Sequence, residues 1–338
     1  MTKIAGPIVR LIDRAVIRLA RLHLDKRVEG KNRGPEIQAL PAEPDFFGGE
    51  VRPPEDLDFS GSHGFSCDSP MEGVAPECRR IHGRFYRCGD QWRKRPVVIM
   101  LHGWNGENCY QLLFPLLAHQ CRRNGISLLS FLFPCHGKRR APSGPGNDLI
   151  SPDLSAMIHS THQAIADAQA LIGWLHQQGC GPIGIWGISL GAWLAGLLAC
   201  NDDRVSFAVL MSPVVRMDRA IEELEFCAPI RRSLAGREAP FQGLNLTDQQ
   251  PLMARQNLLL VEGRHDLFAP RQWVEELWEA WGRPPIERFD HGHISILFSL
   301  KAMIRTLGFV RDRAKTTTRK GVAGAGATVR NVHRHSDS

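Results

Sequence analysis

A serine between two glycines is the first residue of this chain whose setting suggests chemistry. Gly187, Ser189 and Gly191 form a G-x-S-x-G pattern between a run that predicts a strand and a run that predicts a helix ending near Cys200. In such a pattern a tight strand-to-helix turn exposes the serine hydroxyl and points a helix N-terminus at the reacting centre. Ser189 is therefore the expected nucleophile, and a glycine-rich turn that merely contains a serine is the alternative.

A serine hydroxyl is a weak nucleophile, so it needs a base, and a third group must orient that base. Asp266 follows a late predicted strand and offers the orienting carboxylate, with Asp218 as the alternative acid. His291 and His293 both follow the last predicted strand and are the candidate bases. The chain order serine, aspartate, histidine is the one expected for a serine on this type of turn.

Alternating strands and helices must position these residues. Short apolar runs predict buried strands that end near residues 101, 133, 187, 211, 263 and 290, and helical patterns separate them. This alternation predicts an α/β fold with a doubly wound, mostly parallel sheet. The carboxyl ends of its strands share one edge, which collects the segments 102–106 and 134–140, Ser189, and the segments after Gly263 and Asp290.

The sequence divides into three parts. Residues 1–60 predict an amphipathic helix and an extended linker, residues 61–312 the α/β domain, and residues 313–338 a disordered basic tail. Within the domain, residues 213–253 lack periodicity and predict a short cap insertion over the site. The chain of 338 residues is 43% hydrophobic, which suffices for one large core.

The N-terminal helix allows two interpretations. Its apolar positions recur at helical spacing (Ile8, Leu11, Ile12, Ala15, Val16, Leu19 and Leu22), and arginines gather on another side (Arg10, Arg14, Arg18 and Arg21). A basic amphipathic helix can lie on an anionic membrane, so residues 4–24 are a candidate for peripheral membrane contact. The alternative is a helix that packs this apolar face on the domain.

Composition excludes several classes. Nine scattered cysteines without a C-x-x-C pair predict neither a disulfide framework nor a zinc site, and we expect no metal and no cofactor. The net charge of +7 lies partly in the terminal regions, and no basic stripe with interleaved aromatics predicts nucleic-acid binding. Without a signal-peptide core or an apolar run of about 18–20 residues, a cytoplasmic protein is expected, with membrane contact at most peripheral.

With these motifs together, the chain resembles the α/β-hydrolase superfamily, in its esterase and lipase-like branch. The matching segments are L-H-G-W-N-G, G-I-S-L-G, G-R-H-D and H-G-H-I, within about residues 80–310. The resemblance favours His293 over His291 as the base, because the family's histidine commonly follows a glycine. His265, beside the acid, is then expected to be a loop hydrogen-bonder, and His102 a loop brace.

The resemblance implies hydrolysis of a carboxylic ester through an acyl-serine. Two backbone amides should hold the oxyanion, one from Leu190 and the other from Trp104, with Asn105 as the alternative donor. Acyl transfer to another acceptor, thioester or peptide cleavage, and a non-catalytic binding protein of the same fold stay open. The expected partner is a small-molecule ester.

Two groups of residues bear on that substrate. The aromatic side chains of Trp104, Trp186, Trp193 and Phe268 are candidates for an acyl pocket, with core packing as the alternative for Trp186 and Trp193. Arginines in the cap insertion either meet an anionic substrate or are solvated surface residues (Arg216, Arg219, Arg231, Arg232 and Arg237).

Overall fold

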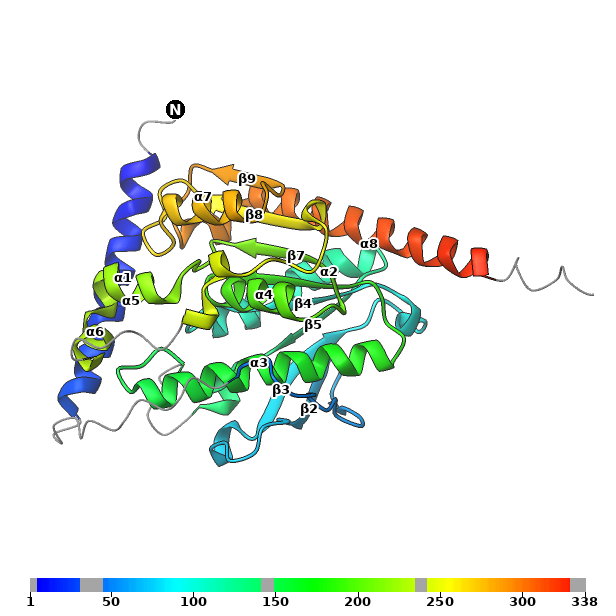
Figure 1. Ribbon diagram of the computed structural model, residues 1–338, viewed down its shortest axis with the longest axis horizontal. Coiled ribbons are helices and arrows are strands. Elements are labelled where there is room, and N and C mark those ends of the chain that lie inside the picture. Colours follow the sequence, from blue (N-terminus) through cyan, green and yellow to red (C-terminus); the bar gives the residue numbers. More distant parts are fainter. Residues whose placement is uncertain (1–4, 31–44, 141–148, 235–241, 329–338) are drawn as a thin grey trace, which may run out of the picture.

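In the described part of the chain, a nine-stranded sheet forms the centre of the protein (Figure 1). The computed structural model describes residues 5–30, 45–140, 149–234 and 242–328. The strand order is β1-β2-β3-β5-β4-β6-β7-β8-β9; β1, β2 and β3 join antiparallel, and all pairs from β5 to β9 are parallel. The strands are β1 (Asp58–Ser60), β2 (Gly64–Asp68), β3 (Arg80–Tyr86), β4 (Val97–Leu101), β5 (Ser127–Phe131), β6 (Ile183–Ile188), β7 (Val205–Met211), β8 (Leu258–Gly263) and β9 (Ile286–Phe289).

Helices cover both faces of this sheet. The α-helices of the described segments are α1 (Ala5–Gly30), α2 (Phe114–Arg123), α3 (Leu154–Gln177), α4 (Leu190–Asn201), α5 (Met217–Glu223), α6 (Ala228–Leu234), α7 (Arg271–Ala280) and α8 (Leu300–Thr328). Short turns of other helix types include η3 (Cys109–Leu113), η5 (Glu225–Cys227) and η9 (Ser295–Phe298).

The alternation within β4 shows why its sequence is apolar throughout. Val97, Ile99 and Leu101 share one core cluster with residues of α3 and α4. Val98 and Met100 belong to a second cluster with residues of α2 and α8. Because both faces of the strand are buried, no polar position interrupts the run, as expected for a central parallel strand.

The predicted fold class is confirmed: the sheet is doubly wound, mostly parallel and flanked by helices. β7 has the predicted bounds, whereas β1 and β2, whose residues 58–68 lack a clear apolar pattern, were not expected. Asp153 caps the N-terminus of α3, because its side-chain carboxylate accepts the amide of Ala156 (3.1 Å). The cap insertion contains α5 and α6, where the sequence predicts no regular element.

The ends of the chain also differ from expectation. α8 extends to Thr328, past Arg313, where the sequence predicts the start of a disordered tail. Residues 329–338 of that tail, residue 4 of the N-terminal helix, residues 31–44 of the linker and Arg237 of the cap lie outside the described residues.

The N-terminal helix packs on the domain through a face that the sequence did not indicate. α1 buries Val9, Asp13, Ile17 and Leu24. Most of the apolar positions at helical spacing face solvent instead (Ile8, Leu11, Ile12, Ala15, Leu19 and Leu22). The interpretation in which this apolar face packs on the domain is therefore wrong, although the helix itself does dock there.

Three further features concern redox, metal and membrane chemistry. None of the nine cysteines forms a disulfide. Over the described segments, no group of three or more His, Cys, Asp or Glu side chains is arranged to hold a metal ion. Over the same segments, no helix has both the length and the hydropathy needed to cross a bilayer.

A buried ion pair fastens the loop after β5 to α3. Arg139 and Asp167 are fully buried, with 2.7 Å between Nη1 and Oδ2. Arg139 also donates to the carbonyl oxygens of Leu132 (2.9 Å) and Cys78 (2.6 Å). Burial raises the pKa of Asp167, and the charge of Arg139 opposes this shift. Since this loop also carries His136, the pair holds a segment at the edge where the parallel strands end.

We expect Asp167→Ala to lower the free energy of unfolding by about 3–5 kcal/mol, because it leaves the Arg139 guanidinium buried without its carboxylate. Urea denaturation of the purified variant measures this. Asp203→Ala removes an exposed carboxylate and should change stability by no more than about 0.5 kcal/mol. If both variants lost the same free energy of unfolding, the buried ion pair would contribute no more to stability than an exposed carboxylate does.

Candidate active site

Ser189 occupies a strained turn between β6 and α4. Its backbone angles are φ 55° and ψ −117°, which a residue with a side chain rarely adopts. The flanking glycines are required by space: a Cβ on Gly187 would lie 2.0 Å from the carbonyl oxygen of Gly191. A Cβ on Gly191 would lie 2.3 Å from the carbonyl oxygen of Leu101. The G-x-S-x-G spacing thus lets the turn pass β4 while the serine projects from the edge of the sheet.

A hydrogen-bonded chain joins three side chains at this edge. Ser189 Oγ lies 2.8 Å from His293 Nε2, and His293 Nδ1 lies 2.8 Å from Asp266 Oδ2. The other oxygen of Asp266 accepts the amides of Phe268 and Ala269, both at 2.8 Å. The carboxylate is therefore fixed from behind, and it fixes the ring that faces the serine.

The rival residues lie elsewhere. His291 Nδ1 is 3.2 Å from the hydroxyl of Ser295, and His291 has no place in the chain to Ser189. The amide of His265 donates to the carbonyl oxygen of His291 (3.0 Å). Asp218 instead receives two hydrogen bonds from Arg216, at 3.1 and 2.6 Å. Of the candidate acids and bases, only Asp266 and His293 belong to the hydrogen-bonded chain that ends at Ser189.

The loop after β4 lies against the serine and is braced by a histidine. A Cβ on Gly103 would lie 3.2 Å from the Cβ of Ser189, a tight contact that a glycine avoids where the loop passes the serine. His102 Nε2 accepts the amide of Phe133 (3.1 Å), and its Nδ1 lies 2.7 Å from the Gly103 carbonyl oxygen. Burial lowers the pKa of His102 to about 3. His102 is thus a neutral brace between two loops.

The geometry separates the two candidates for the second oxyanion donor. The amide of Asn105 donates to Nε2 of His136 (3.2 Å), so that amide is already engaged. Leu190 is the first residue of α4, where backbone amides have no partner within the helix. This argues against Asn105 as the second donor, and it leaves the amide of Leu190 placed to meet a developing oxyanion.

Aromatic rings line the space beside His293. The ring centroids of Phe268 and His293 are 4.7 Å apart, those of Phe226 and Phe268 are 5.4 Å apart, and those of Trp104 and Phe226 are 6.1 Å apart and stacked. Phe226 comes from η5 in the cap insertion, and sequence reasoning missed it because no periodicity marks that segment. An apolar wall from three separate loops therefore borders the hydrogen-bonded chain.

The two other tryptophans expected near a pocket belong to the core. Trp186 lies in β6 and is fully buried in the cluster formed with α2 and α8. Trp193 lies in α4 and donates its indole N–H to the carbonyl oxygen of Leu244 (2.7 Å), which ties the cap insertion to the domain. Core packing is thus the correct interpretation for both.

An acidic residue from the N-terminal helix reaches the same site, and the sequence did not single it out. Asp13 is fully buried, and its carboxylate accepts the amides of His293 (2.8 Å), Ile294 (3.2 Å) and Leu267 (3.2 Å). A Cβ on Gly292 would lie 2.7 Å from Asp13 Oδ2, so the glycine makes room for the carboxylate. The available signal was that Asp13 is the lone acid between residues 5 and 24.

These carboxylates set the electrostatics of the imidazole. Burial alone would lower the pKa of His293, but the charge and hydrogen bond of Asp266, and more weakly the charge of Asp13, raise it above its ordinary value. Burial raises the pKa of Asp13, and the amides of His293 and Ile294 oppose that shift. The imidazolium form is therefore stabilised at the position where it would arise after a proton transfer from Ser189.

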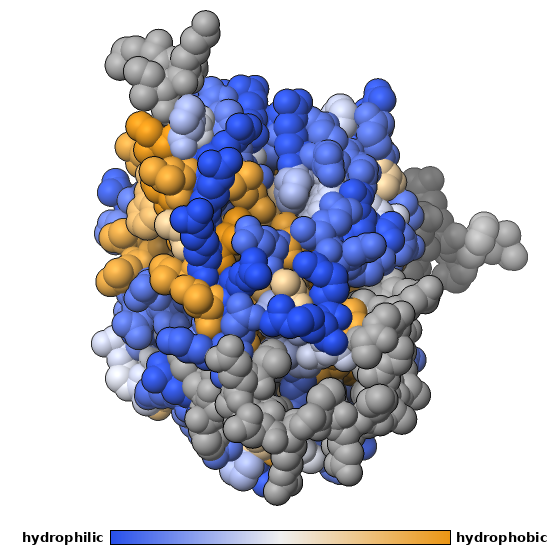
Figure 2. All heavy atoms as spheres, turned by 90° about the vertical axis from the view of Figure 1, so that its left-hand side faces the viewer, coloured by the Kyte–Doolittle hydropathy of each residue, from blue (hydrophilic) through white to orange (hydrophobic). Residues whose placement is uncertain are grey.

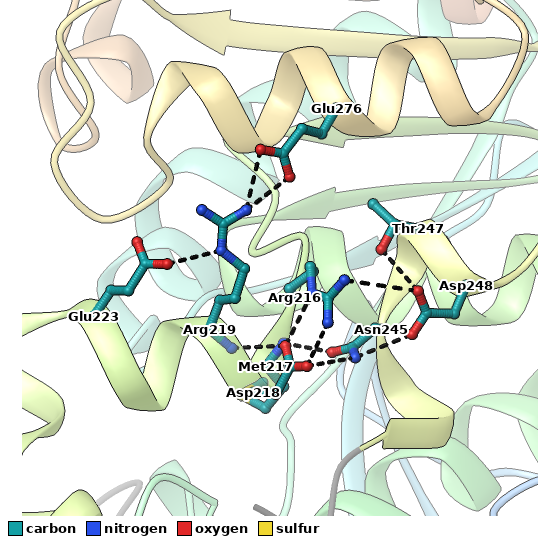
Figure 3. A network of polar contacts seen from close by, with 9 residues as sticks. All are labelled: Arg216, Met217, Asp218, Arg219, Glu223, Asn245, Thr247, Asp248 and Glu276. Carbon is teal, nitrogen blue, oxygen red and sulfur yellow. Dashed lines mark hydrogen bonds and ion pairs between the residues drawn. The ribbon is translucent and has the colours of Figure 1, made fainter.

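The cap arginines form ion pairs within the protein (Figure 3). Arg216 pairs with Asp218 (2.6 Å), and Arg219 pairs with Glu223 and Glu276, both at 2.8 Å. Since Glu276 lies on α7, the second arginine links the cap insertion to the domain. Burial would raise the pKa of Asp218, but hydrogen bonds, from Arg216 foremost, hold it below its ordinary value.

The remaining described cap arginines behave in the same way. Arg231 donates to the carbonyl oxygens of Ile221 (2.6 Å) and Glu222. Arg232 pairs with Asp25 of α1. These contacts fasten the cap insertion to itself and to α1, and they argue against a cationic surface that meets an anionic substrate.

Comparison with known proteins agrees with this architecture. The model of the alpha/beta hydrolase family matches residues 98–325. Among solved structures, an esterase from Pyrococcus furiosus aligns with a TM-score of 0.51 and 20% identity over 78% of this chain and 99% of that one. An acetyl xylan esterase from Paenibacillus sp. R4 aligns with a TM-score of 0.53 and 16% identity over 76% and 89%. At such identities the likeness shows the fold alone.

Curated relatives match a smaller part of the chain. An uncharacterized protein of Mycobacterium tuberculosis, Rv2627c, is 29% identical over 50% of this chain and 42% of its own length. The thiohydrolase aneE of Aspergillus aculeatus is 26% identical over 51% of this chain and 52% of its own length. The chain thus spans about half the length of these relatives or less. With the family model matching well over half of its residues, this chain belongs to the alpha/beta hydrolase family.

Proposed function

We propose that this protein is a serine hydrolase that cleaves a carboxylic ester through an acyl-serine intermediate. The hydrogen-bonded chain from Asp266 through His293 to Ser189, with both steps at 2.8 Å, carries the proposal. Ser189 is the nucleophile, His293 the general base and acid, and Asp266 the group that orients the imidazole. Catalysis in this proposal needs no metal and no cofactor.

The reaction has two halves, formation and hydrolysis of the acyl-serine, and His293 first accepts and then returns a proton in each half. His293 Nε2 accepts the Ser189 proton as Oγ attacks the ester carbonyl carbon, and the carbonyl oxygen becomes an oxyanion facing the amides of Leu190 and Trp104. The imidazolium then gives its proton to the leaving alkoxide, and an alcohol departs. Water, deprotonated by His293, attacks the acyl-serine, and the carboxylic acid leaves as Ser189 regains its proton.

The surroundings of the serine support an uncharged acyl group. Phe268, Phe226 and Trp104 border His293 with apolar surface. The described cap arginines are engaged in ion pairs or with backbone carbonyls, which gives no reason to expect an anionic substrate. The proteins of similar fold include esterases, and one relative is named a thiohydrolase, so a thioester belongs in the first substrate panel.

One experiment tests the proposal against a binding protein of the same fold. The folded chain is treated with a fluorophosphonate probe and then assayed on p-nitrophenyl esters of increasing acyl length and on an acyl thioester. We expect labelling at Ser189 and hydrolysis of at least one ester series. Absence of both labelling and hydrolysis in the folded protein would refute the catalytic proposal and favour binding without chemistry.

The electrostatics of His293 predict a pH profile. The imidazole must be neutral to accept the serine proton, and the neighbouring carboxylates raise its pKa. We therefore expect kcat/KM for an uncharged ester to fall with decreasing pH, with the half-maximal point above 6.5, the ordinary pKa of histidine. A stopped assay across pH 5 to 9 measures it, and a midpoint below 6.5 would contradict the assignment.

A further inference from the structure

The outer face of α1 is an apolar surface on an anchored helix. Five large side chains, which we call the α1 stripe, are between 41% and 66% exposed (Ile8, Leu11, Ile12, Leu19 and Leu22). The opposite side of the helix holds Val9, Asp13, Ile17 and Leu24 against the domain. Because that side is fixed, the stripe cannot turn inward to bury itself. An apolar surface of this kind marks an interaction site more often than isolated exposed residues do.

Arginines flank the α1 stripe. Arg10, Arg14 and Arg18 are exposed and recur every four residues, so they form a row along the helix, between the stripe and the side that packs on the domain. Figure 2, which views the molecule from the side of α1, shows a strongly hydrophilic column bordered by a field of hydrophobic residues. Apolar residues beside a row of cations complement an anionic lipid surface, which has negative headgroups above an acyl layer.

We propose that the outer face of α1 docks the protein on an anionic lipid surface. The stripe enters the boundary between headgroups and acyl chains, and the arginines extend to the phosphates. Figure 1 shows α1 standing across the carboxyl ends of the strands, the edge at which Ser189 lies. Phe298, at the end of η9 and four residues after the Ile294 amide bound by Asp13, is 83% exposed and adds apolar surface near this edge. If the proposed function holds, docking delivers lipid-borne esters to this side.

Vesicle sedimentation tests the docking. Ser189→Ala protein is mixed with vesicles of phosphatidylcholine and phosphatidylglycerol, or of phosphatidylcholine alone, at low salt. We expect binding to the anionic vesicles, a loss of at least about tenfold in the double variant L11E/L19E, and a similar loss when Arg10, Arg14 and Arg18 become glutamine. Leu252→Glu, at another exposed leucine (58%), is the matched control and should bind normally.

The results distinguish a lipid surface from a second copy of the chain as the partner that covers the α1 stripe. Failure to bind anionic vesicles, with a monomeric protein by light scattering, overturns the proposal. A concentration-dependent dimer that L11E/L19E dissociates, without vesicle binding, shows that a second copy covers the stripe and also overturns it. Vesicle binding by the Ser189→Ala protein, when the wild-type chain neither labels nor hydrolyses esters, leaves the docking intact and refutes the proposed function alone.

A second inference rests on the inner face of the same helix, and it depends on the proposed function. The carboxylate of Asp13 accepts hydrogen bonds from two loops. The Leu267 amide comes from the loop after β8, which carries Asp266, and the His293 and Ile294 amides come from the loop after β9. Leu267 follows Asp266 directly, so the contact acts on the backbone of both triad partners. We infer that Asp13 is a positioning residue that holds the two loops in register.

The charge of Asp13 contributes to the raised pKa of the His293 imidazole. The ionisable groups that act on His293 are Asp266, from the loop after β8, and Asp13, from α1. Removing the Asp13 charge while keeping its shape should therefore lower the pKa of His293 and shift the acid limb of the pH profile to lower pH. A role confined to packing would leave that limb in place.

Asp13→Asn and Asp13→Ala test this together. We expect Asp13→Ala to lower kcat about 10- to 100-fold with little change in KM, because the loops lose their shared acceptor. Asp13→Asn should restore part of kcat and move the acid limb to lower pH. Asp25→Asn is the control on the same helix, α1. It weakens the ion pair between Asp25 and Arg232 of α6, and it should change neither kcat nor the acid limb of the pH profile.

A titration that needs no activity keeps the inference falsifiable. The imidazole signals of His293 are followed by NMR in a Ser189→Ala background, with and without Asp13→Asn. A lower midpoint in the double variant supports the positioning role even if the wild type proves inactive or Asp13→Ala fails to fold. An unchanged midpoint together with an unchanged kcat in Asp13→Asn refutes it.

Discussion

Ser189→Ala is expected to reduce kcat/KM for a p-nitrophenyl ester by at least about a thousandfold, with the fold intact. The hydroxyl is the atom that forms the acyl-enzyme bond, and alanine keeps the Cβ in the strained turn while removing Oγ. The residual rate reflects only the oxyanion amides and substrate binding. Initial rates with the best ester of the panel and labelling by a fluorophosphonate measure the loss, and labelling should vanish.

Ser233→Ala is the matched control for this variant. The Ser233 hydroxyl donates to the carbonyl oxygen of Pro229 within α6, so its removal leaves the hydrogen-bonded chain untouched. We expect its activity to stay within about threefold of the wild type. Retention of most of the activity in Ser189→Ala, with a normal circular dichroism spectrum, would exclude Ser189 as the nucleophile.

The sequence was most informative where a side chain must satisfy a local rule. β4 was predicted because burial on both faces demands uninterrupted apolar residues. The tight turn was predicted from Gly187 and Gly191, and the structure requires glycine at both positions, because a Cβ there would lie 2.3 Å or less from backbone atoms. Such constraints act within a few residues of chain, so a single sequence displays them.

Contacts between segments far apart in the chain could not be predicted from the sequence. Helical periodicity left the apolar side of α1 either to a membrane or to the domain. The side that packs on the domain is another one, which buries Asp13, because three backbone amides across the interface require an acceptor. That requirement arises only when residues 267, 293 and 294 come together. Phe226 escaped notice for the same reason, since its contact with Phe268 depends on how the cap insertion folds back.

The cap arginines show how composition misleads when partners are unknown. A cluster of arginines in the cap insertion suggests either anion recognition or solvated surface residues, and the structure pairs Arg216 and Arg219 with carboxylates instead. Asp218, the alternative acid, is one of those partners. The contact between Arg216 and Asp218 therefore argues both against anion recognition by Arg216 and against Asp218 as the acid, and no spacing rule in the sequence would have shown it.

Substitution of the two histidines His291 and His293 is expected to have very different effects on activity. We expect His293→Ala to lower kcat/KM by at least about a thousandfold and His291→Ala to change it less than about threefold. Only His293 Nε2 lies within hydrogen-bond distance of Ser189 Oγ (2.8 Å), whereas His291 Nδ1 faces Ser295 (3.2 Å). The two positions are two residues apart in one loop, so each variant controls for disturbance of that loop by the other.

The two variants also test the base independently of the nucleophile. In His293→Ala the serine should label with fluorophosphonate far more slowly, and the acid limb of the pH profile should disappear from the residual activity, because the titrating base is gone. In His291→Ala both should match the wild type. The reverse pattern would assign the base to His291 and would require the loop after β9 to rearrange before catalysis. Equal losses in both variants, with reduced thermal stability, would instead show that the loop as a whole had been disturbed.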